Sequence, residues 1–157
     1  MGAIRERIET ALREAEQEDD KDRTAVLRLI NAAILDKDFT ERSRGNQEGI
    51  TDSVICDILR QMRHQRLNSA KRHDENWQVE LAERHRQGAR VIDGLLPRQL
   101  TQSEHRQAVS EVISEIGATG IRDRGRVIRV LRVRFSERLD FDATGKLVDD
   151  ALSLPSK

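Results

Sequence analysis

The chain has 157 residues, of which 28 are basic and 28 acidic, so its zero net charge gives no overall attraction to nucleic acid or to an anionic membrane. With 36% hydrophobic, 36% charged and 3% aromatic residues, the composition is typical of helices with narrow apolar stripes. The sequence lacks an apolar run of about 18 residues, begins with charged residues and has a single cysteine. We therefore expect a cytoplasmic protein without a membrane span or an internal disulfide.

The first two predicted helices carry apolar residues three or four positions apart. The first stripe consists of Ile4, Ile8, Leu12 and Ala15. A charged turn follows, and Asp22 is the expected N-cap of the second helix. The second stripe consists of Val26, Leu27, Ile30, Ala33 and Ile34. Residues 42–49 have no apolar pattern and are expected to form an exposed loop.

The next segment predicts a long antiparallel helical hairpin. Thr51 is the expected N-cap of its first helix, with Ile50 and Ile55 as a hydrophobic staple. The apolar stripe ends after Met62, and the pattern breaks near residues 73–76. In its second helix the apolar positions resume at the following residues: Trp77, Leu81, Ala82, Ala89, Val91, Ile92 and Leu95. The polar outer part, residues 63–86, is thus the tip of the hairpin.

Pro97 interrupts the helical pattern because proline lacks a backbone N–H and disfavours helical geometry in the residue before it. Thr101 and Glu104 then match the capping box of a new helix, which Gly117 is expected to end in left-handed geometry. Two more helices are expected at about 122–135 and 143–152. The sequence therefore predicts an all-α protein, with an N-terminal helical domain over 1–96 and a small three-helix bundle over 97–157.

The one local charge excess lies in the middle helix of this bundle. Seven arginines and two acidic residues fall between Ile121 and Arg138. Such a face could bind RNA phosphates without reading sequence. The candidate RNA-binding residues are Arg122, Arg126, Arg129, Arg132 and Lys146. Few aromatic residues interleave with them, so structured RNA suits this surface better than stacked single strands. The alternative is a solvated helix face whose charges pair with acidic neighbours.

The sequence offers little else with a chemical role. The four histidines and Cys56 lack metal-ligand spacing, and no nucleophile or nucleotide-binding motif is present, so no metal, cofactor or catalytic residue is expected. Cys56 is expected to be a small core residue. Trp77, the single tryptophan, is expected either to pack against the other helix of the hairpin or to be an exposed anchor for a protein partner.

An ordered set of short segments resembles the GatB/YqeY family of small helical proteins. The segments are residues 25–34, 65–66, 69–70, 80–83, 96–100, 117–119, 121–127 and 145–148. The resemblance implies an N-terminal helical domain followed by a domain similar to the tail of the B subunit of glutamyl/aspartyl-tRNA amidotransferase, which contacts tRNA. One departure is Asn76-Trp77, where relatives often have glycines at the hairpin turn.

The resemblance implies a non-catalytic accessory of tRNA metabolism, with tRNA or a tRNA-charging or amidation complex as partner. By resemblance alone the chain could also carry the label of a carbon–nitrogen ligase with glutamine as amido-N-donor, although no residues are identified that would perform this reaction. The alternative function is a protein–protein interaction adaptor that binds its partner through the polar hairpin and Trp77.

Overall fold

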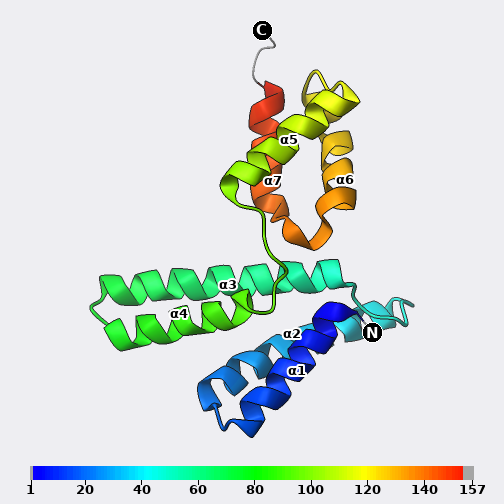
Figure 1. The fold of residues 1–157 in the computed structure, drawn as a ribbon. Coiled ribbons are helices and arrows are strands. Elements are labelled where there is room, and N and C mark those ends of the chain that lie inside the picture. The colour runs from blue at the N-terminus through cyan, green and yellow to red at the C-terminus, as the bar shows by residue number, and fades with distance from the viewer. Residues whose placement is uncertain (1, 154–157) are drawn as a thin grey trace. The chain divides into compact units, whose positions relative to one another are not determined.

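The computed structural model describes residues 2–153, and over this range the chain is all-α, as the sequence predicts (Figure 1). It divides into two compact units, Met1–Leu96 (unit 1) and Pro97–Lys157 (unit 2). None of the helices in the described range is both long and apolar enough to cross a membrane.

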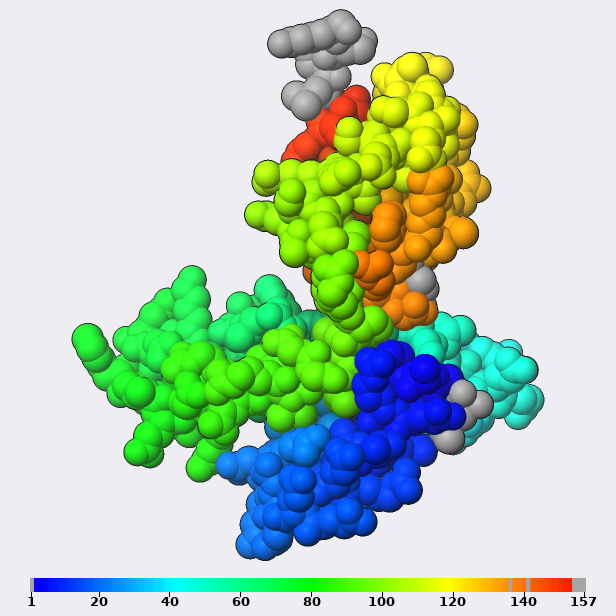
Figure 2. All heavy atoms as spheres, in the orientation of Figure 1, coloured from blue at the N-terminus to red at the C-terminus, as the bar shows by residue number. Residues whose placement is uncertain are grey.

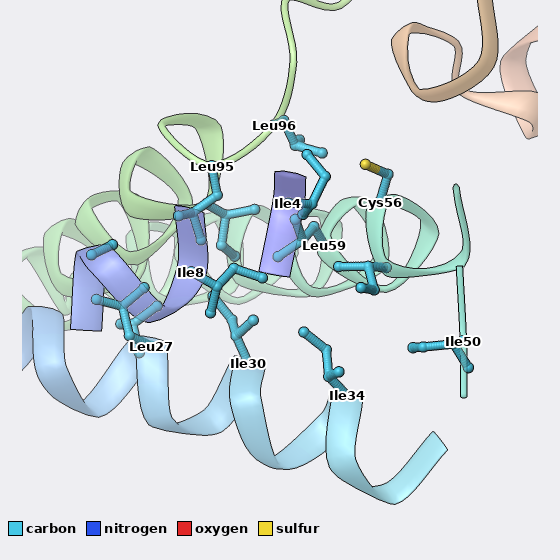
Figure 3. Packing of buried hydrophobic residues seen from close by; sticks show 14 of the residues in the cluster. Ile4, Ile8, Leu27, Ile30, Ile34, Ile50, Cys56, Leu59, Leu95 and Leu96 are labelled. Atoms are coloured by element: carbon cyan, nitrogen blue, oxygen red, sulfur yellow. The ribbon is translucent and has the colours of Figure 1, made fainter. Parts of the chain in front are cut away.

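Unit 1 consists of two helical pairs (Figure 1). The first pair is α1 (Ala3–Gln17) with α2 (Lys21–Ser43), and the second is α3 (Asp52–Glu75) with α4 (Val79–Asp93). Their shared core contains mainly isoleucine and leucine side chains, among them Ile8, Ile30 and Leu59 (Figure 3). Cys56 is completely buried in this core, as predicted. The second pair is the predicted antiparallel hairpin.

The outer part of the hairpin is held by small residues instead of large ones. Ala70 of α3 and Ala82 of α4 are buried in this part, residues 63–86, and Gly88 and Ala89 are buried just beyond it. Small side chains let the two helix backbones approach closely, so this polar segment remains helical without a large apolar core of its own. In the space-filling view the tip, in green, extends to the side of unit 1 away from the N-terminus (Figure 2).

Unit 2 is a three-helix bundle with its own core. It contains α5 (Gln102–Ile116), α6 (Arg124–Phe135) and α7 (Phe141–Ser153), with short 3-10 helices η1 (Ile121–Asp123) and η2 (Ser136–Arg138) on either side of α6. The buried hydrophobic residues of this core are Ala108, Val109, Val112, Val127, Leu131, Leu139, Val148 and Leu152. The predicted capping box at Thr101 and Glu104 is present, and Gly117 ends α5 with a φ of 65°.

Several local predictions are wrong. Asp20 and not Asp22 caps α2, because the Asp20 carboxylate accepts a hydrogen bond from the Arg23 backbone N–H. The helix then continues to Ser43, so the first two residues of the predicted loop are helical. The apolar pattern ends before the helix does, because the last turn of α2, residues 40–43, contains no apolar residue.

Candidate RNA interface and hairpin tip

The basic surface of unit 2 begins in the turn that follows α5. Gly117 reverses the chain, and the Asp123 carboxylate accepts a hydrogen bond from the Thr119 backbone N–H at 3.0 Å. This bond is the main reason that the pKa of Asp123 lies below its ordinary value. Arg122 therefore lies in η1, and the predicted helix starts two residues later, at Arg124. Arg122 and Arg126 consequently do not lie on one continuous α-helix.

Three of the seven arginines stabilise the bundle. Arg124 forms an ion pair with Asp149 of α7 at 2.5 Å. Arg134 forms a bidentate ion pair with Glu115 of α5, in which two guanidinium N–H groups donate to the two carboxylate oxygens. Arg138 donates to the Arg98 backbone carbonyl at 3.1 Å. The Arg134 guanidinium also keeps the pKa of the Glu115 carboxyl below its ordinary value, chiefly through this hydrogen bond.

The four arginines predicted to bind RNA are all exposed, but they differ in their hydrogen-bond and ion-pair partners. Arg126 pairs with Asp123 at 3.1 Å, so its charge is partly neutralised. Arg129 donates to the Gly125 carbonyl oxygen one turn back, at 3.3 Å. Within the described range no carboxylate lies within 4.0 Å of Arg122 or Arg129. Charge pairing, the alternative interpretation, thus accounts for part of the basic segment and leaves these two guanidinium groups available to an anion.

Lys146 is exposed on α7, three residues before Asp149. Because Asp149 pairs with Arg124 at the start of α6, this ion pair brings the face of α7 that carries Lys146 next to the N-terminal end of α6. Val133, 85% exposed, lies between the last arginines of α6. This valine is a feature that the charge pattern does not indicate. It gives the basic surface an apolar contact point.

The hairpin tip places Trp77 in solvent. Its side chain is 89% exposed, so the expectation that it packs against the other helix is wrong. Leu81, another of the apolar positions of this helix, is 40% exposed, and the neighbouring Val79 is 62% exposed. Three apolar side chains therefore lie uncovered at the end of the hairpin.

The backbone at Trp77 is left-handed, with a φ of 60°. The Gln78 N–H donates to the His73 carbonyl at 2.8 Å, and the Trp77 N–H donates to the Asp74 carbonyl at 3.1 Å. This is the Schellman ending of a helix, in which the position of Trp77 usually belongs to glycine. The turn thus has the geometry that favours glycine although a tryptophan occupies it.

Two of the three histidines of the hairpin pack with each other. The rings of His73 and His85 are stacked, with 5.2 Å between their centroids. Burial, followed by the nearby charge of Arg66, lowers the pKa of His85. Elsewhere, His105 of unit 2 is buried and hydrogen-bonded to the Thr144 hydroxyl at 2.8 Å. Over residues 2–153 no group of three or more His, Cys, Asp or Glu side chains is arranged to hold a metal ion.

A family model described as "Yqey-like protein" matches residues 5–152, which is nearly the whole chain and spans both units. A search of the curated proteins finds no match.

Proposed function

The chain belongs to the YqeY-like protein family, and on this basis we propose that it is a non-catalytic accessory protein of tRNA metabolism that contacts RNA phosphates through unit 2. The observation that carries the proposal is the exposed basic surface formed by Arg122, Arg126, Arg129, Arg132 and Lys146. Its members come from η1, α6 and α7, and two of its guanidinium groups have no carboxylate within 4.0 Å in the described range.

The guanidinium groups of this surface suit the binding of phosphate. Guanidinium groups form paired hydrogen bonds with phosphate oxygens. The helix that carries most of them, α6, is packed in the three-helix bundle through Val127 and Leu131, and the ion pairs of Arg124 and Arg134 also join it to α7 and α5. Aromatic platforms for base stacking are not part of the described basic surface, so we expect affinity for structured RNA with little sequence preference.

A mobility-shift titration of tRNA tests this proposal. With about four phosphate contacts, we expect affinity to fall about 10²-fold between roughly 50 and 200 mM salt. The variant Arg126→Glu, Arg129→Glu, Arg132→Glu should lose binding, because it replaces attraction by repulsion on one surface.

The matched control is Arg13→Glu, Lys71→Glu, Arg84→Glu, which changes the net charge equally at exposed positions of unit 1. Circular dichroism of both triple variants checks that the helices remain. Equal loss of binding in the two variants, or no binding of the unmodified chain at low salt, would refute the proposal. Amide formation by the isolated chain from misacylated tRNA, glutamine and ATP would refute its non-catalytic part.

The alternative function is a protein–protein interaction adaptor that binds through the hairpin tip. The observation that favours it is Trp77, which is exposed and held in a backbone conformation that costs a non-glycine residue about 1–2 kcal/mol. Strain kept at an exposed aromatic residue is a reason to suspect a binding role.

Trp77→Gly separates the two functions. It removes the ring while suiting the left-handed turn, so the hairpin should remain folded. If the adaptor function is correct, a protein captured by the unmodified chain is lost with this variant while tRNA binding is unchanged. A captured protein that is retained would exclude Trp77 as the anchor.

A further inference from the structure

Unit 1 contains an open cavity of about 530 Å³ between the first turns of α2 and the α3–α4 hairpin. Its lining includes apolar side chains from both sides, Ala25 and Val26 of α2 and Val91 of α4. Arg66 of α3 lines the same cavity, so an apolar surface and a guanidinium group face one space. The volume falls within the range of about 300–1,000 Å³ that is usual for small-molecule sites.

Arg66 extends across the backbone of α4 at Gly88. A Cβ atom at this glycine would lie 2.4 Å from Nη1 of Arg66, 2.6 Å from its Cδ and 2.7 Å from its Cζ. Gly88 is itself buried, and Arg66 is only partly exposed. The missing side chain at Gly88 thus lets the guanidinium group lie directly against the helix, partly out of water.

The guanidinium group of Arg66 has no protein partner in the described range. No carboxylate lies within 4.0 Å of it, and none of its N–H groups donates to a protein acceptor there. Burial lowers the pKa of Arg66, whereas carboxylate partners raise the pKa values of Arg86 and Arg98. Removing an unpaired charge from water costs free energy, and an anion bound beside Arg66 would offset this cost.

The other charges at the cavity are either paired or exposed. Arg90 pairs with Glu83 at 2.6 Å. Arg84 has no carboxylate within 4.0 Å in the described range, but its side chain is exposed, so its charge remains hydrated. Asp20 and Asp22 also line the cavity and are exposed. Because these two carboxylates repel anions, the cavity favours a ligand with a single anionic group.

We propose that this cavity binds a small molecule that carries one phosphate or carboxylate group on an apolar body, with the anionic group held by Arg66. The planar fork of guanidinium N–H donors matches two oxygens of either group. The apolar lining contacts the body of the ligand. RNA fits less well, because a strand would bring several phosphates close to Asp20 and Asp22. The site lies entirely in unit 1 and does not depend on tRNA binding by unit 2.

His85 offers a spectroscopic readout of this site, because it lies about one turn before Gly88 on α4. Burial, followed by the charge of Arg66, lowers the pKa of His85. An anion that neutralises Arg66 should therefore raise this pKa and shift the ring signals of His85 in NMR spectra. The probes are phenyl phosphate and benzoate, each titrated into the full chain at low salt. One charge-assisted contact predicts a Kd of about 0.1–10 mM, and the tighter probe identifies the anionic group.

Two variants test the contact. Arg66→Met keeps the apolar stem and removes the charge, whereas Gly88→Ala keeps the charge and fills the space of the guanidinium group. Each should weaken binding about tenfold or more, measured from the NMR signals of the probe so that the affinity does not depend on His85. Circular dichroism should show intact helices, since alanine favours a helix more than glycine does. The matched control, Arg13→Met, removes an exposed charge of α1 and should bind as the unmodified chain does.

Lack of binding by both probes at about 20 mM overturns the proposal. Binding that persists in Arg66→Met overturns it too, because the guanidinium group is then not the contact. Equal weakening in Arg13→Met would mean that net charge, and not the cavity, attracts the anion. If tRNA shifts the His85 signals while neither probe does, the ligand is a nucleic acid and the small-molecule assignment is wrong.

Discussion

Asp38 connects three segments of unit 1 although it is a charged residue that is only 1% exposed. Its two carboxylate oxygens accept hydrogen bonds from the Arg5 guanidinium at 2.8 and 2.7 Å, and one of them also accepts from the Ile50 N–H at 2.8 Å. Arg5 in turn donates to the Ile50 carbonyl at 2.9 Å. This network joins α1 and α2 to the loop before α3.

Removal of the Asp38 carboxylate should be costly. Asp38→Ala leaves the Arg5 charge, which is 21% exposed, without its buried partner. We expect a loss of about 3 kcal/mol in the free energy of unfolding, measured by urea denaturation. Asp38→Asn should lose less, because the amide oxygen can still accept from Ile50. A change below about 0.5 kcal/mol for the alanine variant would mean that the network does not stabilise unit 1.

The same pair predicts a pH dependence. The hydrogen bonds from Arg5 are the main reason that the pKa of Asp38 lies below its ordinary value of 3.8. A carboxyl with a lowered folded-state pKa stabilises the protein above its unfolded pKa, and this contribution disappears as the pH falls through the folded one. The stability difference between the unmodified chain and Asp38→Asn should therefore be constant at neutral pH and shrink below pH 3.8. A difference that stays constant down to pH 2, roughly two units lower, would contradict this.

The position of Gly49, next to the Arg5–Asp38 pair, has room only for glycine. Its φ is 81°, and a Cβ atom at this position would lie 2.4 Å from an Asp38 carboxylate oxygen. Gly49→Ala should lower the free energy of unfolding by at least about 2 kcal/mol, because backbone strain adds to displacement of a buried carboxylate. Gly117→Ala is the matched control, since its φ is also positive but nothing lies within 4 Å of its Cβ. If Gly49→Ala and Gly117→Ala lower the free energy of unfolding of their own units by similar amounts, backbone strain alone accounts for the loss.

At the scale of the element, the α3–α4 hairpin depends on the small size of its buried residues. Ala82 is completely buried and Ala89 is 2% exposed, seven positions apart on α4. Seven residues are about two helical turns, so both side chains lie on the face that meets α3. The sequence periodicity identified this face but included Trp77 and Leu81, which only the three-dimensional turn excludes.

Enlarging one of these residues should separate the helices. Ala82→Leu is expected to lower the free energy of unfolding by about 1–3 kcal/mol through overpacking. Leu81→Ala, the adjacent exposed position, should change it by less than about 0.5 kcal/mol. Thermal denaturation followed by circular dichroism measures both. If the two substitutions have equal effects, Ala82 is not at a tight helix–helix contact.

At the scale of the whole molecule, the two separate cores predict that a destabilising substitution in one unit leaves the stability of the other unchanged. Leu59 is completely buried in the core of unit 1, and the core of unit 2 contains none of the same residues. Leu59→Ala should cost about 2–5 kcal/mol. Hydrogen exchange should then quicken over residues 2–96 while residues 97–153 keep their protection. Equal acceleration in both ranges would mean that the units unfold as one.

The sequence alone determined the elements of this protein, because their signals are local. The capping box at Thr101 and Glu104, the left-handed Gly117 and the apolar stripes each involve residues within a few positions of one another. The resemblance to the family, identified from short segments in order, is confirmed by the match over residues 5–152.

Only the tertiary structure decided which residues are buried, which are exposed and which form ion pairs. The Arg5–Asp38 pair joins residues 33 positions apart, and the Arg124–Asp149 pair joins residues 25 apart, so no periodicity could reveal them. For the same reason the sequence could not tell which arginines are engaged in the bundle and which are available. Sequence patterns report on residues within about one helical turn of each other. Burial and ion pairing depend on residues that are far apart in the sequence and that the fold brings into contact.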